Sequence, residues 1–257
     1  MIMELVRLIK SLVRGNKDLD LGQLPSRGLF YPEDFSIKIK RASSEQIVHY
    51  ETNFVEKDMF SIIESIKRVV EANAVFPENY NFRYLKVIDL IWVFLEIVKF
   101  TQDKKININY FDSDSSLVKE VEISNESFNY FNFSKFESFY NAEEKIFEMQ
   151  GYRFSLPSIG VESDLLKYLN SKSAKKSGRD LTDMNYNFIF FLGMKDSITK
   201  KEIENLITIF NDDLDKKEME KIEAIIEEFS KSIKYTLKIG KKVIDLQSKI
   251  QLKEIFR

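Results

Sequence analysis

The sequence predicts an α+β fold that is helix-rich, with a short N-terminal strand and a β-hairpin-containing middle segment. Apolar residues recur with a helical period at 56–72 and 84–100. From residue 105 the period changes to the two-residue alternation of strands, and helical patterns return after 160. The 257 residues are 44% hydrophobic and 31% charged, as in an ordinary globular protein of one large or two small domains.

Residues 1–15 are predicted to form an amphipathic N-terminal helix that Gly15 can end. Its apolar residues share one helical face: Ile2, Leu5, Val6, Ile9, Leu12 and Val13. Three uses of this face are open: packing on the chain's own domain, docking onto another chain, or lying on a membrane surface, for which the polar face is only mildly basic. If the helix docks, Leu5, Ile9 and Leu12 are partner-binding residues. Residues 16–23 are expected to be a linker.

The stretch LPSRGLFYP at 24–32 is specified almost residue by residue. Two prolines fix their φ angles, and Gly28 permits a turn that other residues resist. The backbone therefore holds two aromatic side chains in a preset geometry, and such side chains lose little entropy on binding. The stretch is predicted to bind a partner through Pro25, Arg27, Gly28, Leu29, Phe30, Tyr31 and Pro32. The alternative is that the two aromatics fill the core of the chain's own domain.

The following residues are expected to enter the first domain through a strand. FSIKIK at 35–40 alternates like a half-buried strand. Three helices are predicted next, at about 44–52, 56–72 and 84–100. A capping box of Ser43 and Gln46 begins the first of them. The third is apolar around most of its circumference, so we expect it at the centre of the core.

Hairpins are predicted in the middle of the chain. Residues 106–111 and 117–123 flank the turn DSDSS, and 145–156 read as a hairpin or as one strand bent at Gly151. Helices return at about 161–170, 182–192, 199–210 and 215–234. N-terminal caps are predicted at Thr199, which forms a capping box with Glu202, and at Asp213 and Asp215. The tail alternates like a strand at 235–246.

A break at 101–104 divides the chain into a strand plus helical region at 22–100 and a region of β-hairpins followed by helices at 105–257. Four residues are too few for a flexible linker, so we expect the two regions to pack as one unit. SKSAKKSGRD at 171–180 has the composition of a mobile loop.

The pentapeptide LPSRG at 24–28 recurs as LPSIG at 156–160. A duplicated unit is one explanation. A shared need for a proline-set turn beside a strand is favoured, because the flanking residues do not match.

The sequence lacks the residues of the common catalytic and metal sites. It has no cysteine and one histidine, His49, which excludes disulfides and multi-histidine metal sites. It has no P-loop, GxGxxG, GxSxG or HExxH pattern. NDDLDKKE at 211–218 lacks the glycine of a calcium loop, and the carboxylates of DLTD at 180–183 are expected to cap a helix. We therefore predict no catalytic, cofactor-binding or metal-binding residue, and an enzyme is disfavoured.

The charge balance and the hydropathy argue against nucleic acid and a membrane as partners. Lys plus Arg number 39 and Asp plus Glu 41, whereas nucleic-acid binders usually have a basic excess. Stacking of the aromatics of NYNFRYLK at 79–86 on nucleic acid is less expected than their packing on the next helix. No apolar run is long enough for a secretory signal or a membrane span, so a cytoplasmic location is expected.

Two parts of the sequence resemble the baseplate hub assembly proteins of T-even-type contractile-tail bacteriophages. The first is an LPS-x-G-x-FYP turn followed by a strand and a segment with glutamate, FSIKIKRASSEQ at 35–46. Its matching residues are Leu24, Pro25, Ser26, Gly28, Tyr31 and Pro32. The second is a helix pair with an aspartate at the head of its second helix, here Asp89 in LKVIDLIWVFLEIVKFT. The resemblance covers about 22–100. The strand is shorter, and the glutamate helix more aromatic, than is usual in that family.

The resemblance implies tail morphogenesis by a non-enzymatic hub assembly factor or minor structural component that works through protein–protein binding. The implied partners are other phage tail and baseplate proteins, in the cytoplasm of the infected bacterium or retained in the virion tail. No nucleic acid and no cofactor is implied, membrane contact is disfavoured, and homo-oligomer formation is open. The alternatives are an intracellular adaptor or regulatory binding module unrelated to phage, and an enzyme whose site the patterns above miss.

Overall fold

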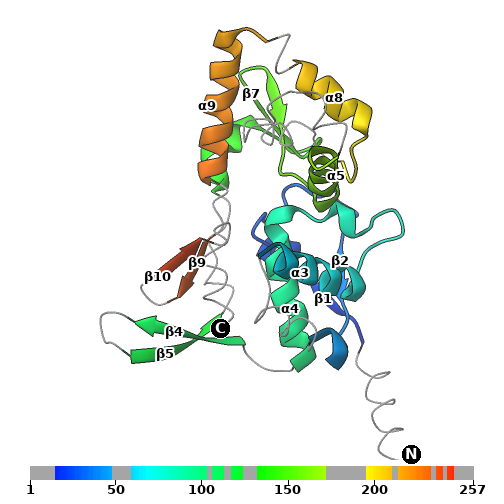
Figure 1. The fold of residues 1–257 in the computed structure, drawn as a ribbon, viewed down its shortest axis with the longest axis vertical. Helices are drawn as coiled ribbons and strands as arrows, with labels where there is room; N and C mark the ends of the chain where they lie inside the picture. Colours follow the sequence, from blue (N-terminus) through cyan, green and yellow to red (C-terminus); the bar gives the residue numbers. More distant parts are fainter. Residues whose placement is uncertain are drawn as a thin grey trace, which may run out of the picture.

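The computed structural model describes residues 15–47, 59–102, 106–112, 117–123, 132–171, 195–209, 214–232, 236–239 and 242–245. Two lobes and two separate hairpins make up the described chain (Figure 1). This architecture confirms the predicted α+β fold. The helices predicted at 1–15 and 182–192, His49, and the carboxylates at 180–183 lie outside the described residues.

The first lobe combines a three-stranded antiparallel sheet with two helices that pack on each other. The strands, in sheet order, are β1 (Lys17–Leu19), β2 (Ile37–Ile39) and β3 (Ala74–Val75). The helices are α3 (Met59–Asn73) and α4 (Leu90–Gln102). Strand β2 confirms the strand predicted at 35–40, and eight consecutive buried residues from Leu90 to Ile97 confirm that α4 is a central core helix. The capping box of Ser43 and Gln46 is also present, with both hydrogen bonds at 2.8 and 3.1 Å.

Two predictions for this lobe were wrong. Residues 16–23 are not a linker, because Leu19 is buried on β1 and Asp20 caps a short 3₁₀ turn, η1 (Leu21–Gln23). The helix predicted from residue 84 begins only at Leu90. Two 3₁₀ turns precede it, η2 (Phe82–Tyr84) and η3 (Val87–Asp89), since the backbone groups of 85–87 bind other parts of the chain.

The second lobe packs three helices with another three-stranded antiparallel sheet. The strands, in sheet order, are β6 (Tyr140–Asn141), β7 (Ile146–Met149) and β8 (Tyr152–Phe154). The 3₁₀ turns η5 (Phe133–Lys135) and η6 (Glu137–Phe139) precede them. The helices are α5 (Ile159–Leu169), α8 (Lys200–Thr208) and α9 (Lys216–Ser232). Strands β7 and β8 confirm the second predicted hairpin, which turns through Gln150 and Gly151 with φ angles of 55° and 86°.

Two of the helix caps predicted for the C-terminal half are confirmed. Thr199 and Glu202 form a complete capping box at the start of α8. The Asp215 carboxylate accepts a 2.8 Å hydrogen bond from the backbone N–H of Glu218 at the start of α9. Asp213 lies outside the described residues.

The two hairpins project to one side of the lobes in the view of Figure 1. The first, of β4 (Ile106–Asp112) and β5 (Leu117–Ile123), has the predicted pairing, from Ile106 opposite Ile123 to Asp112 opposite Leu117. The second pairs β9 (Thr236–Ile239) with β10 (Lys242–Asp245). The strand-like alternation predicted at 235–246 is confirmed, and its two described stretches pair as a hairpin.

Buried apolar side chains form two separate clusters, one for each lobe. The first core takes its members from 19–97 and adds Ile159 from the second lobe. The second core takes its members from 136–229 and adds Phe30 from the first. The break predicted at 101–104 lies between the two stretches of chain. Each core thus receives one fully buried side chain from the other half of the sequence, and Leu29 and Ile88 also pack against the second core.

Candidate functional site

The motif LPSRGLFYP forms a tight loop between β1 and β2. Arg27 and Gly28 both have positive φ angles, 57° and 71°. A side chain is disfavoured at Gly28 for a second reason, because a Cβ there would lie 3.0 Å from Leu21 Cβ and 3.2 Å from its carbonyl oxygen. Backbone hydrogen bonds from Arg27 N–H to Leu24 O (2.8 Å) and from Leu29 N–H to Ser26 O (3.3 Å) close the turn. The loop is therefore held by its own backbone.

The two adjacent aromatics of this loop enter different cores. Tyr31 belongs to the first core and stacks on Phe35, with ring centroids 4.3 Å apart. Phe30 is 1% exposed in the second core, 5.6 Å from the ring of Phe147 and 6.5 Å from that of Tyr140. The Tyr140 hydroxyl also donates a hydrogen bond to Leu29 O. The loop is thus a physical link between the lobes.

A buried carboxylate anchors the loop to the turn before α4. Asp89 Oδ1 accepts a hydrogen bond from the backbone N–H of Ser26 at 2.8 Å. Its Oδ2 accepts from the hydroxyls of Ser26 and Tyr31, both at 2.7 Å. The Tyr31 oxygen in turn accepts from the backbone N–H of Lys86 at 2.9 Å. These four residues form what we call the Asp89 cluster, and each of them is at most 2% exposed.

The second copy of the pentapeptide, LPSIG, is hydrogen-bonded to the other side of the turn before α4. Val87 N–H donates to Pro157 O at 3.1 Å, and Ile159 N–H donates to Leu85 O at 2.8 Å. Lys86 and Ser158 form the antiparallel bridge between these bonds. The ammonium of Lys86 donates to Leu156 O at 3.2 Å. Segment 85–89 therefore lies between the two pentapeptides, with Asp89 bound to the first and Lys86 to the second.

The two pentapeptides nevertheless have different backbones. Gly28 in the first lies in a left-handed turn, whereas Gly160 in the second lies in the first turn of α5. Ser26 uses its hydroxyl to bind Asp89, whereas the Ser158 hydroxyl caps α5 through Val161 N–H. The shared sequence thus serves a shared docking site and not a repeated turn.

Burial is the largest cause of the pKa shifts in the Asp89 cluster. It raises the pKa of Asp89 to about 6, against the opposing effect of the hydroxyl donors and of Lys86. It lowers the pKa of Lys86 to about 8, an effect that the Asp89 carboxylate opposes. Burial and the neighbouring Asp89 also raise the pKa of the Tyr31 hydroxyl well above its ordinary value. Both charged groups are therefore buried away from solvent, and this burial costs free energy.

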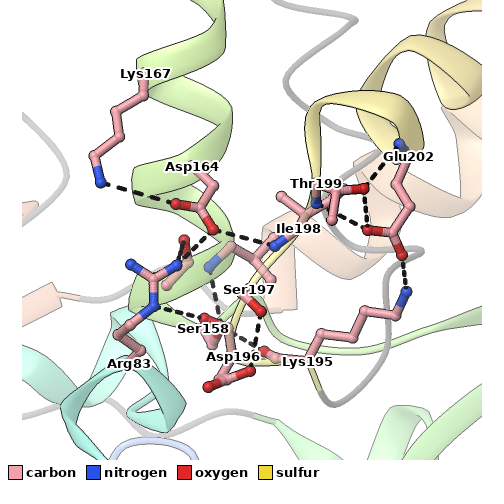
Figure 2. Close-up of polar contacts among 12 residues, drawn as sticks. Arg83, Ser158, Asp164, Lys167, Lys195, Asp196, Ser197, Ile198, Thr199 and Glu202 are labelled. Atoms are coloured by element: carbon pink, nitrogen blue, oxygen red, sulfur yellow. Dashed lines mark hydrogen bonds and ion pairs between the residues drawn. The ribbon is translucent and has the colours of Figure 1, made fainter.

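A second polar cluster extends the link toward α8 (Figure 2). Figure 2 shows the Arg83 guanidinium beside α5 and beside the segment 195–198 that leads into α8. The guanidinium donates to Asp164 Oδ2 at 2.5 Å, to Gly160 O at 3.2 Å and to Asp196 O at 3.1 Å. This planar, forked group thus ties η2 of the first lobe to two parts of the second.

The segment 195–198 is held through its backbone. Ser158 Oγ donates to Lys195 O at 2.6 Å, and Asp164 Oδ2 accepts from Ile198 N–H at 3.1 Å. Gly160 makes the close approach possible, because a Cβ there would lie 1.7 Å from Asp196 O. We call residues 24–32, 83–89, 156–160 and 195–198 together the inter-core joint, and it is our candidate functional site.

The predicted partner-binding residues of the loop differ in how far they are exposed to solvent. Pro25, Phe30 and Tyr31 are buried, Gly28, Leu29 and Pro32 are half-buried, and Arg27 is exposed. The two aromatics fill the chain's own cores, which is the alternative reading of the motif, and they are not exposed anchors in this conformation. Leu5, Ile9 and Leu12 lie outside the described residues, so their partner-binding role stays a prediction.

Sequence reasoning missed Lys86, Arg83, Ser158 and Asp164. Arg83 and Lys86 stand in NYNFRYLK, whose aromatics Tyr80, Phe82 and Tyr84 pack on the first core as expected. The repeated LPS was the one signal that pointed to Ser158. A single sequence does not show that residues so far apart share one buried cluster.

Within the described ranges we find no group of three or more metal-ligating side chains and no helix long and apolar enough to cross a bilayer. The chemistry that the joint itself supports is the binding and orientation of backbone and side-chain groups. Comparison of the chain with protein-family models, curated proteins and solved structures finds no match.

Proposed function

We propose that this chain is a non-enzymatic phage tail baseplate hub assembly factor or minor structural component, which acts by binding other tail proteins. One observation carries the proposal. The residues that resemble the phage family come from two separate places in the sequence, and Ser26 and Tyr31 from the first place bind Asp89 from the second. Residues that are characteristic of one fold are expected to contact one another even when they are far apart in the sequence. The contact between these two motifs therefore supports the resemblance over both motifs together.

The same geometry indicates how the motif serves such a protein. With Phe30 and Tyr31 buried, the loop positions the two lobes and does not itself present large aromatics to a partner. We propose that binding uses the exposed edge of the loop at Arg27, with Leu29 and Pro32 beside it, together with the N-terminal amphipathic segment. A protein of this kind would act in the cytoplasm of the infected bacterium, and its presence in finished tails is a separate question that the experiment below answers.

The test is affinity purification of the tagged full chain from infected cells, read by quantitative mass spectrometry. We expect enrichment of baseplate and tail proteins over an untagged control. Arg27→Glu should reduce that enrichment without lowering the melting temperature, because Arg27 is exposed. Lys40→Glu makes the same charge change at another exposed site and should leave the enrichment unchanged. Mass spectrometry of purified particles then separates an assembly factor from a virion component.

Two results would contradict the proposal. Enrichment of host proteins alone would favour the adaptor or regulatory module unrelated to phage. A gene neighbourhood without tail genes would point the same way.

A further inference from the structure

The inter-core joint places two opposite charges where proteins usually place apolar groups. Lys86 is 2% and Asp89 0% exposed, and the segment that carries them binds both pentapeptides. Buried ions lose their hydration, and their mutual attraction often fails to make up for that loss. The link between the two cores therefore contains buried charges beside the apolar side chains of Phe30 and Ile159.

The two charges differ in how well the surrounding groups satisfy them. Three hydrogen bonds from Ser26 and Tyr31 reach the Asp89 carboxylate. The Lys86 ammonium has three N–H groups, and within the described chain Leu156 O is its hydrogen-bond acceptor. Titratable groups act on Asp89 from two elements, Tyr31 from the loop and Lys86 from its own segment, while the 156–160 element presents the Leu156 carbonyl to Lys86.

We propose that the Asp89 cluster is a charge-strained latch, in which burial of Lys86 and Asp89 makes release of the loop 24–32 and the segment 156–160 from residues 85–89 easiest near neutral pH and harder where either charge is neutralised. Opening the latch returns both groups to water, which relieves the cost of their burial. Closing it seats Phe30 in the second core and Tyr31 in the first. This conformational device does not depend on the phage assignment.

The sign of the pH effect follows from the pKa values of the two groups. The closed joint raises the pKa of Asp89 from 3.8 to about 6, so between these values the closed joint holds a proton that the open joint releases. Acidification from pH 7 therefore favours closure. The closed joint lowers the pKa of Lys86 from 10.5 to about 8, so alkali above pH 8 favours closure as well. Proton linkage from Asp89 alone predicts that the opening equilibrium falls roughly tenfold between pH 7 and pH 5.

Hydrogen exchange of the full-length protein, read by mass spectrometry and corrected for the intrinsic pH dependence of exchange, measures this opening. In the wild type, peptides covering 24–32 and 84–90 should be about ten times better protected at pH 5 than at pH 7. Peptides from α3, which is remote in sequence from the cluster, serve as the internal reference. Equal or lower protection of the joint at pH 5 would overturn the proposal.

Two variants separate the latch from general acid effects. Asp89→Asn should remove the difference between pH 7 and pH 5, whatever its effect on overall stability. Lys86→Met should keep a difference and move its midpoint to higher pH, because Asp89 then lacks the positive charge that lowers its pKa. A difference of unchanged size in Asp89→Asn would overturn the proposal. If neither variant folds, the wild-type comparison decides alone.

Discussion

Replacing Phe30 with alanine should weaken the second core while leaving the first intact. Phe30 stands next to Tyr31 in the chain, yet its ring is 1% exposed among the aromatics of the other lobe. Its ring partners include Phe147 at 5.6 Å and Tyr140 at 6.5 Å between centroids. The substitution therefore removes one packing group from the second core without removing any from the first.

The magnitude follows from the burial of the ring. Loss of a fully buried phenylalanine costs about 3–5 kcal/mol, which combines the lost transfer free energy with the cavity left behind. With a urea slope of about 2 kcal/mol per molar for a domain of this size, the unfolding midpoint of the second core should fall by about 2 M. The first core should keep its midpoint to within a few tenths of a molar.

The chain supplies its own probe for the assay. Its one tryptophan, Trp92, is buried in the first core, so its fluorescence follows the unfolding of that lobe. Far-UV circular dichroism follows the helices of both lobes. In the wild type we expect the two signals to change together, because the inter-core joint couples the lobes. In Phe30→Ala the circular dichroism signal should begin to fall at lower urea than the fluorescence signal.

A matched substitution in the same loop region tests the assignment. Phe35 is buried in the first core, so Phe35→Ala should shift the Trp92 transition to lower urea. Coincident transitions in Phe30→Ala, displaced together or not at all, would refute the view that Phe30 belongs to a separately stabilised core.

Two further substitutions test the joint itself. Tyr31→Phe removes a buried hydroxyl from the Asp89 cluster and should lower the free energy of unfolding by about 1–3 kcal/mol. Tyr80→Phe removes a hydroxyl that is hydrogen-bonded at the surface and should lower it by under about 0.5 kcal/mol. Equal losses of unfolding free energy in a urea titration would contradict the buried role of the Tyr31 hydroxyl. Gly160→Ala would set a Cβ 1.7 Å from Asp196 O, so the chain around Asp196 must move away and limited proteolysis should cut it faster. Gly15→Ala has open space and should not change the cleavage rate, and an unchanged rate in Gly160→Ala would argue against the close approach.

Periodicity predicted the elements whose burial follows one face or one alternation. Helices α3 and α9, strand β2 and the hairpin of β4 and β5 lie close to their expected positions, because apolar spacing alone defines them. Periodicity failed at residues 84–89, where an apolar pattern continues the helix of α4 toward the N-terminus. There the backbone of Leu85 and Val87 pairs with the segment 156–160, and such a non-local pairing leaves no mark on local spacing.

The site was harder to predict than the fold. Pro25, Pro32 and Gly28 announced a defined turn, and the turn is present. Their spacing could not show that Phe30 and Tyr31 point into different cores, because both alternatives satisfy the same local geometry. Neither could it show that a lysine and an aspartate would be buried together, since a charged residue in a sequence is expected at the surface.

Because Phe30 packs in the core of the other lobe, the order of synthesis on the ribosome affects when that core is completed. The first core can be assembled once residue 98 or so has emerged, apart from the late contribution of Ile159. The second core, in which Phe30 packs, also includes residues of α9, which is made about 200 residues after Phe30. At a translation rate of about 5–20 residues per second, the nascent chain carries an unseated phenylalanine for roughly 10–40 seconds. The second core is thus completed only when α9 joins a cluster whose first member, Phe30, left the ribosome early in synthesis.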